Sequence, residues 1–158
     1  MINKIIVATG EYRITQSPNM LITLGLGSCV GVAIYDYINK IGGLIHVMLP
    51  ENRKRINIAK YADTGISQMI SKMVKKGANK TSMVAKIAGG AMMFKIDNEN
   101  DKFKIGERNV KTTRKVLQKE GVKLRGEEVG KNYSRSIKFN TANGVVLVSS
   151  YMQNSTIL

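Results

Sequence analysis

The sequence has no tryptophan, two prolines, and a single cysteine and a single histidine among its 158 residues. One cysteine cannot form an intramolecular disulfide, so the fold does not depend on an oxidising compartment. One cysteine and one histidine cannot complete a closed zinc site unless carboxylates or a second chain contribute. No apolar run is long enough to span a bilayer, and the N-terminal one meets Glu11 and Arg13 too early for a secretory signal. We therefore expect a cytoplasmic protein without membrane insertion and without a metal site.

Acidic residues are scarce: 11 Asp and Glu stand against 25 Lys and Arg, a formal net charge of +14. This balance favours an acidic partner or substrate surface, although solvated basic faces produce the same composition. Nucleic acid is an alternative partner, and it predicts binding at physiological salt that weakens steeply as salt rises. We do not favour it, because aromatic residues make up only 6 % of the chain and the basic runs, 53–55 and 75–76, are short.

The length and the 43 % hydrophobic content are typical of one soluble domain with a sizeable core. No repeat, linker or low-complexity segment divides the chain. We expect a single domain over 1–158, in which 153–158 form a loosely held tail.

Periodicity predicts two amphipathic helices, over 61–76 and 106–119. Short β-prone runs predict strands over 4–8, 21–24, 30–35, 41–49, 83–88, 122–129, 132–140 and 145–151. Polar residues predict loops over 13–19, 51–60 and 96–104. Because hairpins outnumber strand–helix–strand units, the expected fold is an α/β single-domain layered sandwich of mostly antiparallel or mixed strands, flanked by the two helices.

The unique Cys29 and the unique His46 lie in one stretch, residues 21–50. A thiol and an imidazole are the usual parts of a cysteine nucleophile and its base. The runs 30–35 and 41–49 predict a hairpin that brings Cys29, at its start, close to His46, late on the return strand. The structural alternative is that Cys29 is a small buried hydrophobe and His46 a satisfied core residue.

The residues before Cys29 fit a nucleophile turn. Gly25 and Gly27 allow backbone conformations closed to other residues. Backbone N–H groups near Gly27, Ser28 and Cys29 are the candidates to stabilise an oxyanion. We expect Thr23, on the strand entering the turn, to orient the imidazole. No acidic residue lies between Arg13 and Tyr35, so a carboxylate partner would have to come from elsewhere in the chain.

Several motifs, in order along most of the chain, resemble the CheD family of chemoreceptor glutamine deamidases in bacterial and archaeal chemotaxis. They are GLGSC at 25–29, HVMLP at 46–50, KYADT at 60–64, KIAGGA at 86–91 with MF at 93–94, IGERN at 105–109, Gly130, and RS at 135–136. Lys131 departs from the pattern, since the family often has a second glycine there. The stretch 98–104 is also longer and more polar than expected.

The resemblance implies a protein-glutamine glutaminase, which hydrolyses selected glutamine side chains on chemoreceptor cytoplasmic helices to glutamate and ammonia. The family's catalytic residues fall on Cys29, His46 and Thr23, and no cofactor is implied. The resemblance further implies a fold similar to the catalytic domain of the deamidase toxins and binding to the CheC phosphatase.

Two alternatives stay open. A transglutaminase-like amide exchange shares the thioester and differs in the acceptor, so an added primary amine would form conjugates. A non-catalytic binding module would regulate CheC and receptors while Cys29 is structural.

Overall fold

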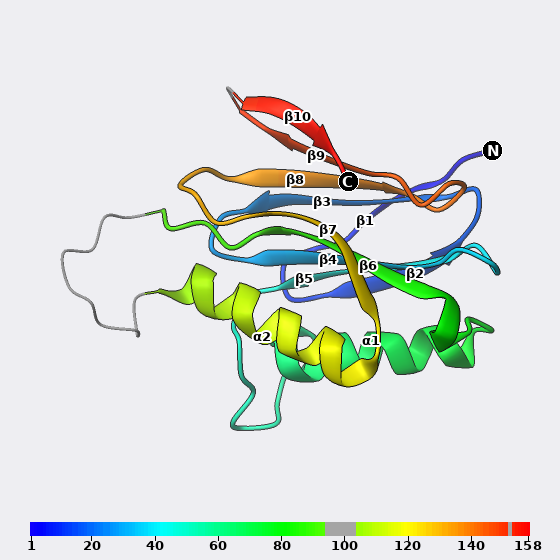
Figure 1. Ribbon diagram of the computed structural model, residues 1–158, viewed down its shortest axis with the longest axis horizontal. Helices are drawn as coiled ribbons and strands as arrows, with labels where there is room; N and C mark the ends of the chain where they lie inside the picture. Colours follow the sequence, from blue (N-terminus) through cyan, green and yellow to red (C-terminus); the bar gives the residue numbers. More distant parts are fainter. Residues whose placement is uncertain (94–103, 152) are drawn as a thin grey trace.

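Two five-stranded sheets pack face to face in the computed structural model, which describes residues 1–93, 104–151 and 153–158 (Figure 1). The first sheet has the order β1-β3-β8-β9-β10 and the second the order β2-β5-β4-β6-β7. The strands of the first sheet are β1 (Lys4–Ile6), β3 (Met20–Leu26), β8 (Arg135–Asn140), β9 (Val146–Ser150) and β10 (Gln153–Ile157). Those of the second are β2 (Tyr12–Gln16), β5 (Ile41–Val47), β4 (Val30–Asp36), β6 (Met83–Gly89) and β7 (Lys123–Val129).

Both α-helices cover the outer face of the second sheet (Figure 1). They are α1 (Ala62–Lys75) and α2 (Ile105–Glu120), accompanied by the short 3-10 turns η1 (Ile58–Lys60) and η2 (Lys80–Ser82). The predicted stripe of α1 is buried, at Ala62, Ile66, Met69, Ile70 and Met73. Gly121 ends α2 with φ +72°, a left-handed conformation that glycine adopts without strain. The predictions of both helices are therefore confirmed to within one residue at each end.

Strand β4 lies at the centre of the second sheet and is buried along its whole length. Its alternate residues Val30, Val32 and Ile34 belong to the core under the helices, whereas Ala33 and Tyr35 belong to the core between the sheets. Such a strand is apolar throughout because both of its faces are covered. The predicted hairpin is confirmed, since β4 pairs antiparallel with β5 over its full length.

The fold is an α/β arrangement of two mixed sheets. Pairing is antiparallel except between β1 and β3 and between β6 and β7. The expected layered sandwich with two helices is present, and both helices lie on one side of it because the first sheet covers the inner face of the second. No helix in the described ranges is both long enough and apolar enough to cross a membrane.

Two segments differ from the sequence predictions. The predicted loop 13–19 is mostly strand β2, which pairs with β5, and Pro18 lies beyond its last residue. The predicted loose tail 153–158 contains strand β10, which pairs with β9 through its backbone while every one of its side chains is exposed. Both are edge strands, where a partly polar sequence is compatible with pairing. The predicted loop 96–104 lies, apart from Lys104, outside the described residues.

Candidate active site

Cys29 lies where the chain crosses from the first sheet to the second. The turn 25–29 leaves β3 in the first sheet and enters β4 in the second. A β-bulge interrupts the pairing of β3 with β8 between Thr23 and Leu26, and Gly25 within it has φ +70°. A bulge bends its strand and re-aims the side chains around it. Gly27, in contrast, has no positive φ, so the left-handed backbone expected of this turn is needed only at Gly25.

His46 lies on β5, opposite Gly31 of β4. Paired residues share a face of the sheet, and a Cβ at Gly31 would lie 2.5 Å from Ile137 Cδ1 of the first sheet. His46 therefore points into the layer between the sheets, where it is 1 % exposed. The antiparallel return that was predicted to bring His46 towards Cys29 is present.

The imidazole is held by Thr23, which is fully buried. Thr23 Oγ1 lies 2.8 Å from His46 Nδ1 and 2.8 Å from the carbonyl oxygen of Val7. A threonine hydroxyl has one hydrogen. Because that hydrogen is donated to Val7, the imidazole must donate its Nδ1–H to Thr23. This leaves Nε2 unprotonated and ready to accept a proton, which is what a general base for a thiol requires.

Nε2 of His46 is buried and has no hydrogen-bond partner among the residues that the structure describes. The Cys29 thiol, half-buried, forms no hydrogen bond with it. Burial lowers the pKa of His46 to about 4. Burial also raises the pKa of the Cys29 thiol, an effect that its own backbone N–H partly opposes. At neutral pH the free site thus holds a neutral imidazole and a neutral thiol rather than an ion pair.

Three consecutive carbonyl groups of the turn are held by the protein. The oxygen of Gly27 accepts from Ala91 N at 2.9 Å, and that of Cys29 accepts from Gly90 N at 2.8 Å. The oxygen of Ser28 accepts from the side chain of Asn109 at 2.9 Å. Within the described ranges, the N–H groups of Ser28 and Cys29 donate to no acceptor in another residue. Free N–H groups beside a thiol are what an oxyanion site needs.

Two buried polar residues near the turn were missed by the sequence analysis as site residues. Asn109, on α2, is fully buried. Arg135, 1 % exposed, forms an ion pair with Glu128 and donates to the carbonyl of Gly130 at 2.8 Å. The available signal in the sequence was that Asn109 is a polar residue on the buried stripe of an amphipathic helix. This position indicates that the side chain is buried, but not which groups it bonds.

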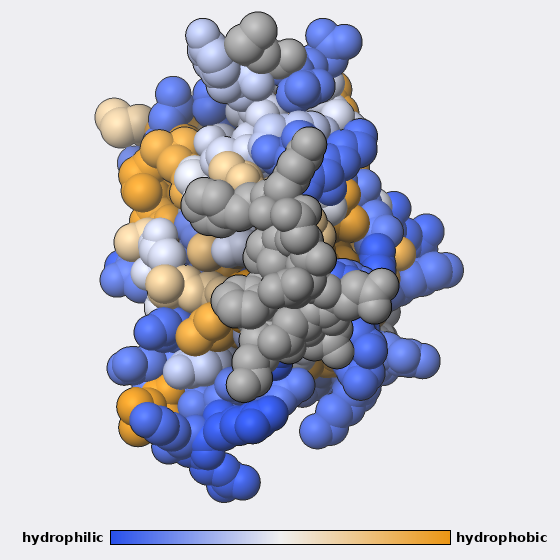
Figure 2. All heavy atoms as spheres, turned by 90° about the vertical axis from the view of Figure 1, so that its left-hand side faces the viewer, coloured by the Kyte–Doolittle hydropathy of each residue, from blue (hydrophilic) through white to orange (hydrophobic). Residues whose placement is uncertain are grey.

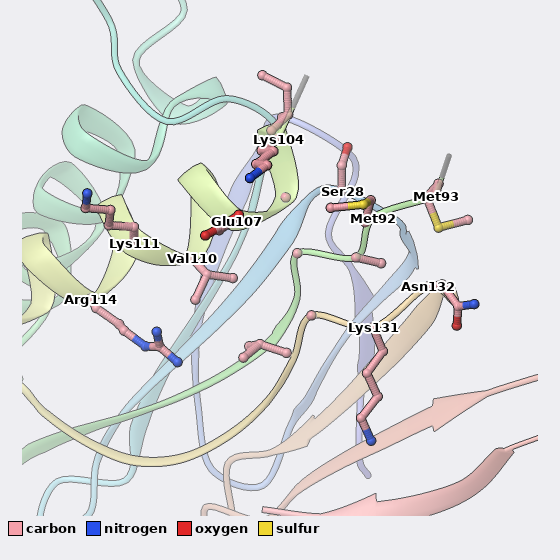
Figure 3. Close-up of a pocket in the computed structure, with 16 residues that line it drawn as sticks. Ser28, Met92, Met93, Lys104, Glu107, Val110, Lys111, Arg114, Lys131 and Asn132 are labelled. Carbon is pink, nitrogen blue, oxygen red and sulfur yellow. The ribbon is translucent and has the colours of Figure 1, made fainter. Parts of the chain in front are cut away.

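A cavity of about 980 Å³ opens beside the turn, next to Ser28. Figure 3 shows its walls: α2 and the residue before it on one side, and residues 129–132 on the other. Among the described residues, one acidic side chain, Glu107, and four basic ones line the cavity. The basic residues are Lys104, Lys111, Arg114 and Lys131. Figure 2 faces this end of the molecule, whose lower part is strongly hydrophilic. The described charged side chains of this cavity wall are therefore mostly basic.

The fold and the site together define an α/β sandwich protein in which a cysteine and a threonine-bound histidine gather at one end, between two sheets. The model of the family described as "CheD chemotactic sensory transduction" matches residues 48–150. The chain is 45 % identical over 147 residues to a protein of Caldanaerobacter subterraneus subsp. tengcongensis named "Probable chemoreceptor glutamine deamidase CheD", with 91 % of each chain covered. A relative of the same name from Lachnoclostridium phytofermentans is 42 % identical, again over 91 % of both chains. The chain belongs to the CheD family, which confirms the predicted resemblance.

Among solved structures, the chain is similar to a Neisseria meningitidis protein of the DUF152 family. The TM-score is 0.51 with 9 % identity, over 82 % of this chain and 64 % of that one. At this identity the similarity concerns the fold alone.

Proposed function

We propose that this protein is a chemoreceptor glutamine deamidase, which hydrolyses glutamine side chains of receptor cytoplasmic helices in the cytoplasm. Membership of the CheD family supports the activity and the receptor substrate. The observation that supports the site is the Thr23–His46 hydrogen bond, which leaves Nε2 as a free base beside the turn that carries Cys29.

In the proposed mechanism, Cys29 Sγ attacks the carboxamide carbon of the glutamine while His46 Nε2 takes the thiol proton. The backbone N–H groups of Ser28 and Cys29, with Gly27 shaping the turn, hold the oxyanion of the tetrahedral intermediate. The imidazolium returns the proton to the nitrogen, the C–N bond breaks, and ammonia leaves a thioester on Cys29. Nε2 then takes a proton from water, whose oxygen adds to the thioester carbon. The C–S bond breaks, the imidazolium returns its proton to Cys29 Sγ, and glutamate is released. No cofactor takes part in this scheme.

The test is incubation with a purified receptor cytoplasmic fragment, followed by peptide mass spectrometry of glutamine-to-glutamate conversion. We expect conversion by the wild type and none above background by Cys29→Ala, with both proteins showing the same thermal unfolding midpoint within a few degrees. Equal conversion by both would refute the enzyme. Binding of the fragment without conversion by either would favour the binding module, for which the missing hydrogen bond between thiol and imidazole is the supporting observation.

We also propose CheC as a partner. Charge supports this, because the net charge of +14 and the basic cavity beside the turn fit an acidic partner surface. Titration of the protein with purified CheC at two salt concentrations tests it, and the expected result is a complex that weakens as salt rises.

The proposed organisation is one CheD-like deamidase domain over 1–158, similar in fold to the catalytic domain of the deamidase toxins. It is supported by a core between the sheets that takes residues from both ends of the chain, from Val7 to Val148. A single cooperative unfolding transition is expected, and two separable transitions would contradict the single domain. Superposition on a solved toxin domain, with its cysteine and histidine on Cys29 and His46, tests the similarity.

A further inference from the structure

Asn109 is buried under the nucleophile turn and bonds both segments of the candidate site. Its Nδ2 donates to the carbonyl of Ser28 at 2.9 Å and to the carbonyl of Met48 at 3.0 Å. Ser28 immediately precedes Cys29, and Met48 follows His46 by two residues. Both acceptors are carbonyl oxygens, so the amide must present its NH₂ group to them. One side chain of α2 therefore ties the segment of the nucleophile to the segment of the base.

Peptide geometry connects Asn109 to the oxyanion site. The carbonyl of Ser28 and the N–H of Cys29 belong to one planar peptide unit and point in opposite directions in a trans peptide. Holding the Ser28 oxygen therefore sets the direction of the Cys29 N–H. That N–H donates to no acceptor in another described residue, and it lies close enough to the thiol to affect the thiol pKa.

The neighbouring peptide units are held by backbone groups instead. Gly90 N and Ala91 N bind the oxygens of Cys29 and Gly27. The first turn of α2 presses directly on this segment, since a Cβ on Gly106 would lie 2.4 Å from Ala91 O. Of the three consecutive carbonyls, that of Ser28 is thus the one held by a side chain, and it shares its peptide unit with the Cys29 N–H.

We infer that Asn109 is a positioning residue for the oxyanion donor: it holds the Ser28–Cys29 peptide so that the Cys29 N–H points at the carbonyl oxygen of the substrate. This rests on the proposed deamidase function. The described hydrogen bonds of Asn109 go to the backbone carbonyls of Ser28 and Met48. Its removal therefore acts on the transition state, in which the oxyanion forms, more than on substrate binding.

The test compares Asn109→Leu, which keeps the volume and removes both donors, with Thr113→Val as the matched control. Thr113 is buried one turn further along α2, and its hydroxyl has no partner in the described part of the chain. Steady-state deamidation of the receptor fragment gives kcat and KM. For Asn109→Leu we expect kcat to fall about 10- to 100-fold with KM within about 3-fold, as for a displaced or lost oxyanion donor. Thr113→Val should keep kcat within about 2-fold, because no bond to the turn is lost.

A second readout separates positioning from general destabilisation. A peptide aldehyde in place of the target carboxamide adds to Cys29 and mimics the tetrahedral intermediate. Asn109→Leu should weaken its binding by about the same factor as kcat falls, while alkylation of Cys29 by iodoacetamide changes by less than about 3-fold. An unchanged kcat, equal losses in Asn109→Leu and Thr113→Val, or a loss confined to KM would overturn the inference.

Asn109→Asp keeps the test decisive if the leucine variant does not fold. At neutral pH its carboxylate faces two carbonyl oxygens and cannot donate, whereas its protonated form donates one hydrogen bond. Its kcat should therefore rise several-fold as pH falls from 8 to 5, while the wild-type kcat does not rise. A profile parallel to the wild type would overturn the inference. A wild type that converts no glutamine refutes the proposed function instead, so the two failures are distinguishable.

Discussion

On one side of Cys29 lie Thr23 and His46, both at most 1 % exposed and joined by a 2.8 Å hydrogen bond between the two sheets. On its other side, past Ser28, lies the basic cavity of about 980 Å³. The buried half of the site has few polar groups, and their positions are set by packing and by the two hydrogen bonds of Thr23. The open half has charged side chains from α2 and from the segment after β7 (Figure 3). The orientation and tautomer of the imidazole are thus fixed in the free protein, and we propose that the charged open half contributes to recognition of the substrate.

Removal of the proposed base, His46, from the buried half of the site should have the largest effect on kcat. We expect His46→Gln to lower kcat for deamidation by about 10³-fold, the middle of the range for general acid–base groups. Alkylation of Cys29 at pH 7 should change by less than about 3-fold, because the neutral imidazole does not stabilise a thiolate in the free site. A 100-fold slower alkylation would instead indicate a thiolate–imidazolium pair.

Thr23→Val should come next, with kcat about 10²-fold lower. The valine cannot accept the Nδ1–H, so the imidazole loses its fixed tautomer and orientation. The matched control is Thr23→Ser, which keeps the hydroxyl and should stay within about 5-fold of the wild type. Equal losses in the two variants would mean that the methyl group, and not the hydrogen bond, matters.

The buried half should also make the fold sensitive to acid. The pKa of His46 is about 4 in the folded protein against 6.5 for the free side chain. Below pH 6.5 His46 becomes protonated in the unfolded chain but stays neutral in the folded chain. The stability that this difference provides is therefore fully present above pH 6.5 and falls as pH falls from 6.5 towards 4. From pH 7 to 5 we expect a loss of about 2 kcal/mol in the free energy of unfolding.

Urea unfolding at pH 7, 6 and 5 measures this loss. His46→Gln supplies the control, since its stability should be nearly flat over that interval. The same slope in both proteins would show that other groups cause the acid sensitivity.

The smallest effect belongs to the open half. Lys111→Ala together with Lys131→Ala removes two positive charges from opposite walls of the cavity. If an acidic part of the receptor lies there, KM for the receptor fragment should rise about 3- to 10-fold at low salt and converge with the wild type at high salt. The value of kcat should not change. A change in kcat with constant KM would contradict the division between the two halves.

Several features could be predicted because their signals are local. The β-branched run 30–35 and its return 41–49 specify a hairpin, and with it the approach of His46 to Cys29. Thr23 could be named because it lies on the strand that enters the turn of Cys29. Strand β10 could not be predicted, since its side chains are all exposed and only backbone pairing holds it.

Asn109 and Arg135 are the clearest cases of residues near the site whose partners the sequence could not predict. Asn109 acts on the carbonyls of Ser28 and Met48, which are far away in the sequence. Arg135 acts on Glu128 and the carbonyl of Gly130, which lie close to it in the sequence but on other segments of the fold. A backbone carbonyl carries no sequence signature, because every residue has one. Which carbonyl a buried donor meets depends on how its element packs, α2 for Asn109 and β8 for Arg135.

The sequence by itself determined the helices and the central hairpin, which joins the strand after the unique cysteine to the strand of the unique histidine, because periodicity and antiparallel register act over short distances. The tertiary structure alone decided the protonation of the imidazole, since Thr23 has one hydrogen and gives it to Val7. It also decided that Nε2 is buried with no partner among the described residues. These properties depend on how two sheets and a helix meet at one end of the sandwich, which no stretch of sequence specifies alone.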